Sequence, residues 1–262
     1  MSTNILEKIV ATKVGEVADR KKQISIAQLE AMPLFEEKTC SLKSNLVDAS
    51  KTGIIAEFKR QSPSKGIINA VADVAEVTKA YTRFGAAGVS VLTDGLYFGG
   101  SLHDLSIAVK NEIPVLRKEF IIDEFQIIEA KAFGASVILL IASCLKPAET
   151  KLLAAKAKQL RMEVLLEIHE ESELEYICDE IDFVGINNRS LKSFEVNIEH
   201  SLKLKDLLPK GKLSIAESGI YDIDTFKLLK QEGFDGFLMG ECFMKQENPA
   251  KAFEEFSKQL KF

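Results

Sequence analysis

Short runs rich in β-branched and aliphatic residues alternate with longer amphipathic segments, and this alternation limits the folds that the chain can adopt. After residue 53, eight runs have the composition of buried strands, namely residues 54–58, 89–92, 115–117, 136–141, 164–168, 183–186, 213–216 and 236–239. Segments with helical spacing of apolar residues lie between many of them, at residues 71–84, 123–133, 149–161, 201–208 and 223–231. The repeating unit is therefore a strand followed by a helix.

Glycines follow several of the expected helices, as at Gly85, Gly134 and Gly233. Glycine readily supplies the left-handed residue that ends a helix. Eight successive strand–helix units predict a (β/α)8 barrel, a TIM barrel, formed by residues 51–262 as one domain. A doubly wound open sheet is the alternative, but it carries a glycine-rich loop after its first strand, where this chain has KRQSPS at residues 59–64.

The first fifty residues lack strand patterns and are expected to form a helical extension. Apolar residues recur at helical spacing between Ile5 and Val17, and Asn4 with Glu7 fits a capping box. A second helix is expected at residues 36–49, after Pro33. We expect this segment, residues 1–50, to pack on the top of the barrel.

Composition excludes several classes of protein. The chain has 262 residues, of which 46% are hydrophobic and 28% charged, so it has enough apolar material for a core and is not disordered. A net charge of −5 argues against nucleic acid as the main partner. The apolar runs are too short to span a membrane, and we expect a cytoplasmic protein. Its four cysteines and three histidines are scattered, so no metal site is expected.

Charged residues stand at the ends of several predicted strands. In a barrel of this kind the carboxyl ends of the strands meet at one mouth, where active sites lie. The charged residues expected there are Glu57, Lys59, Lys118, Glu167 and Glu217. A structural ion-pair network is one interpretation. The other is a catalytic pocket in which glutamates act as bases and lysines as acids, with lysine pKa values lowered by desolvation.

The last two strands end in glycines that suggest an anion site. Gly219 and Gly240 follow them directly, and Ser218 is a further possible donor. Loops at this position of a barrel frequently bind phosphate through backbone N–H groups. Together with Lys59 and the loop around Ser62, they predict a small phosphorylated ligand.

These strand-end segments resemble the motifs of the indole-3-glycerol phosphate synthase family. The matching segments are IAEFKRQSPS (55–64), SVLTD (90–94), YFGGS (97–101), LRKEF (116–120), LLEIH (165–169), GINNR (185–189), AESGI (216–220) and FLMGE (237–241). The resemblance covers nearly the whole chain and implies the monofunctional form. It implies a cofactor-free carboxy-lyase of tryptophan biosynthesis, which closes the ring of 1-(2-carboxyphenylamino)-1-deoxyribulose 5-phosphate with loss of CO2 and water.

The resemblance also implies catalytic roles. Lys118 would be the general acid of ring closure, oriented by Glu57. Glu167 would be the base of the dehydration step and Lys59 its acid. Asn187 and Glu217 would hold the sugar hydroxyls and the lysines.

The same family pattern implies substrate contacts. Arg189 would bind the anthranilate carboxylate as a two-pronged donor. The phosphate would lie against Ser218, Gly219, Gly240 and Glu241, the last through its backbone N–H, with Ser62 nearby. The apolar wall for the anthranilate ring would comprise Phe98, Phe120, Leu139, Ile141, Leu191 and Phe194.

Two rival functions remain open from the sequence. One is another phosphate-binding barrel, such as phosphoribosylanthranilate isomerase or the tryptophan synthase α subunit, although these use other strand-end residues. The second is a barrel that binds a sugar phosphate without turnover, although every acid and base of the family pattern is present. The partner that the sequence indicates is a small sugar-phosphate molecule, with no nucleic acid and no membrane. The sequence does not indicate a protein partner.

Overall fold

Eight parallel strands close into a barrel in the computed structural model, which describes residues 5–189 and 195–260. The barrel strands are β1 (Ile54–Phe58), β4 (Gly88–Leu92), β5 (Val115–Lys118), β6 (Val137–Ile141), β7 (Glu163–Ile168), β8 (Phe183–Asn187), β9 (Leu213–Glu217) and β10 (Gly236–Met239). Strand β1 pairs with both β4 and β10, which closes the sheet. The predicted TIM barrel is therefore confirmed.

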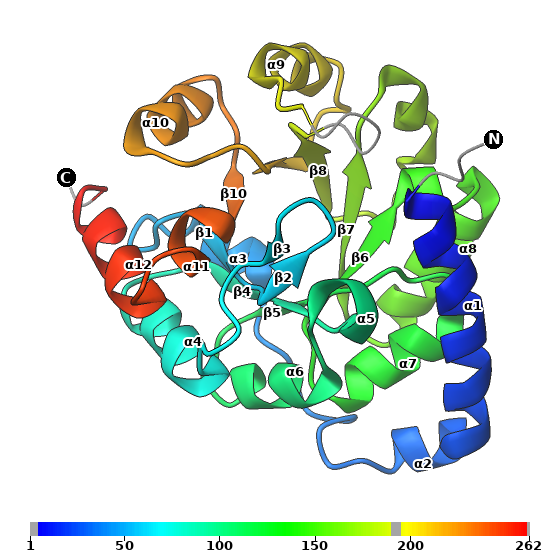
Figure 1. Cartoon of the computed structure of the whole chain (residues 1–262). Helices are drawn as coiled ribbons and strands as arrows, with labels where there is room; N and C mark the ends of the chain where they lie inside the picture. Colours follow the sequence, from blue (N-terminus) through cyan, green and yellow to red (C-terminus); the bar gives the residue numbers. More distant parts are fainter. Residues whose placement is uncertain (1–4, 190–194, 261–262) are drawn as a thin grey trace.

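Helices surround these strands (Figure 1). Those of the strand–helix units are α4 (Val74–Arg83), α6 (Leu102–Val109), α7 (Glu124–Ala132), α8 (Pro147–Gln159), α9 (Ile198–Asp206), α10 (Ile223–Gln231) and α12 (Pro249–Lys258), with a 3-10 helix, Glu171–Tyr176, between β7 and β8. Two short helices, α5 (Gly95–Phe98) and α11 (Glu241–Met244), and the 3-10 turn Ala142–Cys144 directly follow strands. These short elements lie at the barrel mouth and shape its rim.

Alternation along the strands divides the barrel interior into an apolar part and a polar end. Side chains at every second position point inward, and these form a buried cluster that includes Ile55, Leu116, Leu139, Leu165, Phe183 and Ile215. The last inward positions at the carboxyl ends hold polar residues on most strands: Glu57, Lys118, Glu167, Asn187 and Glu217. The period of two thus brings the polar side chains together above an apolar core.

The N-terminal segment reaches both ends of the barrel. Helix α1 (Ile5–Gln23) lies beside α7 (Figure 1) and places Leu6 and Ile9 at the mouth. Helix α3 (Leu42–Val47) lies at the opposite end, where Asn45 Nδ2 donates to Ala87 O over 2.9 Å. The helix expected at residues 36–49 is thus shorter and does not lie at the top. Asn4 falls outside the described residues.

Two further elements were not expected from the sequence. Helix α2 (Ile26–Glu30) begins with a capping box formed by Ser25 and Gln28. A hairpin of β2 (Gln61–Ser62) and β3 (Gly66–Ile67) occupies the loop after β1. Both strands of the hairpin have only two residues, which is too short for a periodic signal in the sequence.

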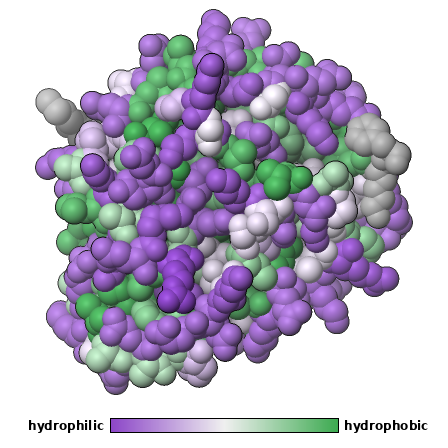
Figure 2. Space-filling model, turned by 180° about the vertical axis from the view of Figure 1, so that it is seen from behind, coloured by the Kyte–Doolittle hydropathy of each residue, from purple (hydrophilic) through white to green (hydrophobic). Residues whose placement is uncertain are grey.

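The outer surface is mixed in character. The face shown in Figure 2 has mostly hydrophilic residues, with hydrophobic residues scattered among them. This is the surface expected for amphipathic helices that bury one side against a sheet. Across residues 5–189 and 195–260, no helix has the length and hydrophobicity to cross a bilayer.

One carboxylate at the amino end of β7 anchors α3. Glu163 accepts hydrogen bonds from Ser41 Oγ at 2.6 Å and from the backbone N–H of Leu42 at 2.7 Å. We predict that Glu163→Ala lowers the free energy of unfolding by about 1 kcal/mol, a typical loss for a helix N-terminal cap. Chemical denaturation measures this loss. KM should stay unchanged, because the amino end of β7 is opposite the mouth, and a raised KM would contradict this assignment.

Candidate active site

A cavity opens at the carboxyl ends of the barrel strands. It is lined by all the catalytic residues proposed from the sequence and by the proposed binding residues Ser62, Phe98, Phe120, Arg189, Ser218, Gly219, Gly240 and Glu241. Leu139 and Ile141, proposed for the apolar wall, line it too, whereas Leu191 and Phe194 lie outside the described residues. The sequence analysis did not anticipate several other lining residues, namely Ile5, Leu6 and Ile9 of α1, with Ser64 and Tyr221.

The ammonium group of Lys118 lies between two buried carboxylates. Its Nζ is 2.9 Å from Oε2 of Glu217 and 3.2 Å from Oε2 of Glu167. Asn187 Nδ2 donates to the other oxygen of Glu167 over 2.9 Å. The residues that surround the ammonium group thus stand at the last inward positions of three adjacent strands, β7, β8 and β9. Lys118 itself reaches them from β5, across the mouth.

The two carboxylates beside Lys118 differ in their pKa values. Burial raises the pKa of Glu167, but Lys118 and His169 outweigh burial, so its pKa lies below the usual range. Burial also raises the pKa of Glu217, and the charge of Glu167 adds to this, so its pKa lies above the usual range despite Lys118. One oxygen of Glu217 has no hydrogen-bond partner among the described residues. Glu167 is thus the more strongly ionised of the two.

The pKa of Lys118 shifts in the direction opposite to the one expected from the sequence. Burial lowers it, but Glu217, Glu167 and Glu57 together raise it above its usual value. Desolvation alone predicts a lowered value, but three carboxylates surround this lysine rather than other cations. Lys118 is therefore a cation in the free protein, and its proton is held until a more basic oxygen comes near.

Glu57 and Lys59 form a second ion pair at the mouth. Lys59 Nζ lies 2.6 Å from Oε1 of Glu57. Burial raises the pKa of Glu57, but Lys59 and then Lys118 outweigh it, so the pKa lies below the usual value. We expected Glu57 to orient Lys118. The carboxylates that contact Lys118 are instead those of Glu167 and Glu217, and Glu57 acts on it at longer range.

Another part of the cavity combines an arginine with a sharp turn of the backbone. The guanidinium of Arg189 lies 3.2 Å from Oε2 of Glu241 and donates to Tyr221 Oη over 2.7 Å and to Ser64 Oγ over 3.2 Å. Ser218 and Gly219 both have positive φ values, of 63° and 72°, so the chain turns sharply after β9. A Cβ on residue 219 would lie 2.4 Å from Val196, so only glycine fits there.

Aromatic side chains form one wall of the cavity. The ring centroids of Phe98 and Phe120 are 5.9 Å apart, and the two planes are tilted by 39°. Leu139 and Ile141 of β6 are buried and belong to the apolar interior as well as to the cavity lining. This wall suits a flat ring, since aromatic pairs prefer offset or tilted contacts at such distances.

His169 and Tyr221 are polar neighbours of the site that the sequence analysis did not propose. His169 Nε2 lies 3.3 Å from Oε1 of Glu167, two residues along the same strand face. Burial lowers the pKa of His169, but the charges of Glu167 and Glu173 outweigh burial, so the pKa lies above the usual value. His169 ends the segment LLEIH and Tyr221 directly follows the segment AESGI, so their positions at strand ends were the available signal. The described residues hold no cluster of three or more histidine, cysteine or acidic side chains arranged for a metal.

Comparison with known proteins decides the family. The profile of indole-3-glycerol phosphate synthase matches residues 6–256. The chain belongs to the indole-3-glycerol phosphate synthase family. An indole-3-glycerol phosphate synthase of Bacteroides thetaiotaomicron is 45% identical over 98% of this chain and 99% of its own length. One of Polynucleobacter necessarius is 40% identical over 97% of this chain and 98% of its own length.

Solved structures of other barrels share the fold alone. Thiamine phosphate pyrophosphorylase from Pyrococcus furiosus has a TM-score of 0.55 at 16% identity, over 72% of this chain and 90% of its own. Orotidine 5'-phosphate decarboxylase from Pyrococcus horikoshii has a TM-score of 0.56 at 12% identity, over 71% of this chain and 92% of its own.

As an indole-3-glycerol phosphate synthase, the chain is a carboxy-lyase of tryptophan biosynthesis.

The opposite pKa shifts of Glu217 and Glu57 predict opposite effects on stability. Glu217 has a raised pKa, so the wild-type protein loses stability as pH rises from the usual value of 4.5 to the raised one. We predict that Glu217→Gln increases the free energy of unfolding at pH 8 by on the order of 1–3 kcal/mol, while lowering activity. This gain should vanish toward pH 4, where the unfolded chain also holds the proton.

Glu57→Gln is the matched control. Glu57 has a lowered pKa, so its ionised form stabilises the fold above pH 4.5, and the variant should be less stable than wild type at pH 8. Urea titrations across this pH range measure both variants. A loss of stability in both at pH 8 would show that the pKa of Glu217 is not raised.

Proposed function

We propose that the chain converts 1-(2-carboxyphenylamino)-1-deoxy-D-ribulose 5-phosphate to indole-3-glycerol phosphate through the residues of this cavity. The observation that supports this proposal best is the position of Lys118, a buried ammonium between two carboxylates that differ in pKa. An aromatic wall lies on one side of it and an anion-binding end on the other. The ring of the substrate would lie against the aromatic wall, its carbonyl group near Lys118, and its phosphate at the anion-binding end.

Ring closure needs a proton at the carbonyl oxygen of the sugar. The ring carbon that bears the carboxylate attacks the carbonyl carbon, and the carbonyl oxygen gains negative charge. Lys118 then donates its proton to that oxygen. Its raised pKa keeps Lys118 protonated in the free enzyme, and the transfer becomes favourable only as the new carbon–carbon bond forms and the oxygen becomes strongly basic.

The following steps release CO2 and water. Loss of CO2 returns the electron pair of its bond to the ring system and needs no base. In the dehydration, an acid protonates the leaving hydroxyl and a base removes a proton, and we assign these roles to Lys59 and Glu167. When Lys118 turns to the substrate oxygen, the cation that lowers the pKa of Glu167 moves away, so Glu167 becomes a stronger base.

Binding roles follow from the two ends of the cavity. Backbone amides of Gly219, Gly240 and Glu241, with Ser218, would hold the phosphate. Ser62 would lie nearby. Arg189 would bind the anthranilate carboxylate after its guanidinium leaves Glu241. Phe98 and Phe120 would contact the ring, and Asn187 and Glu217 the sugar hydroxyls.

We further propose that the protein works in the cytoplasm. Its cysteines in the described residues are free thiols, and Cys40 is exposed. Free thiols persist in reducing compartments.

Indole emission provides the direct test of this reaction. The chain has no tryptophan and only four tyrosines, so new indole fluorescence is readily seen. We predict a time-dependent rise with wild-type protein and a loss of at least about a thousandfold in kcat for Lys118→Ala, because the proton donor is removed. Near-wild-type turnover in Lys118→Ala would remove Lys118 from the role of acid.

Two controls accompany this test. Lys158→Ala removes another ion-paired lysine, which contacts Asp182 on the outside of the barrel, and should leave turnover unchanged. Binding of the substrate analogue whose carbonyl is reduced to an alcohol, together with a thermal melt, shows whether Lys118→Ala is folded. A folded wild-type protein that binds the substrate without any rise in emission would favour the non-catalytic barrel.

Inorganic phosphate should compete with the substrate. The turn at Ser218 and Gly219 faces the cavity together with Gly240, and phosphate alone would occupy the same amides. We predict a rise in apparent KM with phosphate and an unchanged kcat. Sodium chloride at equal ionic strength controls for screening of charges. Equal inhibition by chloride would argue against a specific phosphate site.

A further inference from the structure

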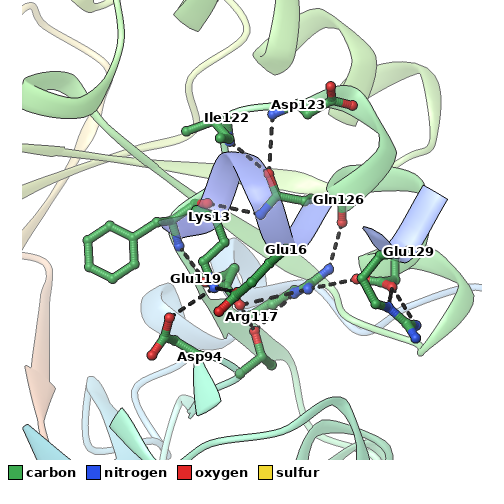
Figure 3. A network of polar contacts seen from close by, with 12 residues as sticks. Lys13, Glu16, Asp94, Arg117, Glu119, Ile122, Asp123, Gln126 and Glu129 are labelled. Carbon is green, nitrogen blue, oxygen red and sulfur yellow. Dashed lines mark hydrogen bonds and ion pairs between the residues drawn. The ribbon is translucent and has the colours of Figure 1, made fainter. Parts of the chain in front are cut away.

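A lysine of helix α1 is buried between carboxylates of two barrel loops. Lys13 is 3% exposed, and its Nζ lies 2.9 Å from Oδ2 of Asp94 and 3.1 Å from Oε1 of Glu119 (Figure 3). Glu16, on the same helix, lies 2.6 Å from this Nζ. Asp94 follows β4 and Glu119 follows β5, so one ammonium group joins α1 to two neighbouring loops of the mouth.

Each of these two carboxylates also holds the backbone of a phenylalanine in the aromatic wall. Oδ1 of Asp94 accepts a hydrogen bond from the N–H of Phe98 at 3.2 Å and caps helix α5, which ends at Phe98. Oε1 of Glu119 accepts from the N–H of Phe120 at 2.9 Å. Lys13 is thus connected to the backbone of both phenylalanines through one carboxylate each, although it does not itself line the cavity.

The charge of Lys13 is what allows both carboxylates to stay in place. Burial lowers the pKa of Lys13, but Glu119, Glu16 and Asp94 outweigh burial and raise it, so the group stays charged. Asp94 and Glu119 are 1% and 4% exposed. Arg117 lies 3.9 Å from Oε2 of Glu119, but Lys13 is the cation that pairs with both carboxylates, and buried like charges without a cation between them repel strongly. Without the ammonium group, the loops after β4 and β5 would move apart or admit water.

We infer that Lys13 is a positioning residue that sets the distance between Phe98 and Phe120 and thereby the affinity for the anthranilate ring. This inference rests on the proposed function, because the spacing of the two rings matters only for a substrate that carries a ring. It assigns a specific function to one residue of α1, distinct from a general role of the helix as a cover.

Helix α1 has a second anchor that provides a matched control. Arg20 Nη2 lies 2.8 Å from Oε1 of Glu129 on α7, and the other oxygen of Glu129 is 2.9 Å from Nη2 of Arg117 (Figure 3). Loss of Arg20 therefore loosens α1 but leaves Glu129 paired with Arg117. It leaves the contacts of Lys13 with Asp94 and Glu119 in place, and Arg117, which also lies 3.9 Å from Oε2 of Glu119, keeps its pairing with Glu129.

The experiment compares Lys13→Met with Arg20→Met in the indole emission assay. We expect Lys13→Met to raise KM about tenfold, with kcat changed less than about threefold, since Lys118 and its carboxylates keep their own contacts. The inhibition constant of inorganic phosphate should stay unchanged, because phosphate occupies the opposite end of the cavity. Lys13→Arg should restore KM in large part, because it returns the positive charge, and Arg20→Met should leave KM near the wild-type value.

Several outcomes would overturn the inference while leaving the proposed function intact. These are an unchanged KM in folded Lys13→Met, an equal rise in KM for Arg20→Met, and a matching loss of phosphate affinity. Absence of indole emission with wild-type protein would instead overturn the proposed function. If Lys13→Met does not fold, the double variant Lys13→Met, Glu119→Gln removes one charge of each sign. Its KM should still rise relative to Arg20→Met, because no ammonium group joins the two loops, but by less than tenfold, because the repulsion between Asp94 and Glu119 is also removed.

Discussion

Closure of the sheet, combined with the two-residue period of its strands, is the constraint on which the rest of the molecule depends. Strand β1 pairs with β4 on one side and with β10 on the other, so the sheet has no open edge. Each strand therefore has one face that points into the closed barrel, away from solvent. Inward residues must therefore be apolar along most of the barrel, as Ile55 and Leu165 are. Charged inward residues are therefore confined to the strand ends, as Glu163 is at the amino end of β7, and at the carboxyl ends the charges face one another across the mouth.

Mutual compensation makes these charges tolerable. Glu57, Glu167 and Glu217 are each less than 5% exposed, and burying even one isolated carboxylate is costly. Lys118 and Lys59 supply positive charge within 3.2 Å of all three. The excess of carboxylate over ammonium explains why the pKa of Glu217 is raised while that of Glu167 is lowered. The chemistry proposed for the site uses this imbalance, because it separates an ionised base from a group that holds its proton.

The sequence predicted the features that depend on the two-residue period of the strands and on the position of residues at strand ends. The strands, the barrel and the residues at the strand ends follow from the alternation of apolar residues and from the rule that carboxyl ends share one mouth. The pairings between side chains did not follow, because they depend on which strand lies next to which and on the reach of each side chain. Glu57 was expected beside Lys118 but contacts Lys59, and the pKa of Lys118 rises because carboxylates, not cations, surround it. Lys13 gave no signal at all, since a lysine on an amphipathic helix ordinarily faces water.

The position of α3 at the closed end of the barrel has a consequence for synthesis on the ribosome. Leu42 and Leu46 of this segment pack near Gly88 and Gly236, and Glu163 accepts hydrogen bonds from Ser41, the N-cap residue of α3, and from the N–H of Leu42. The segment leaves the ribosome first, but its partners at Glu163 and Gly236 are among the later residues to emerge, on the order of ten seconds or more afterwards at about 5–20 residues per second. During that time its leucines have no barrel to cover. Stable docking of α3 on the barrel therefore waits until β7 and β10 have been synthesised.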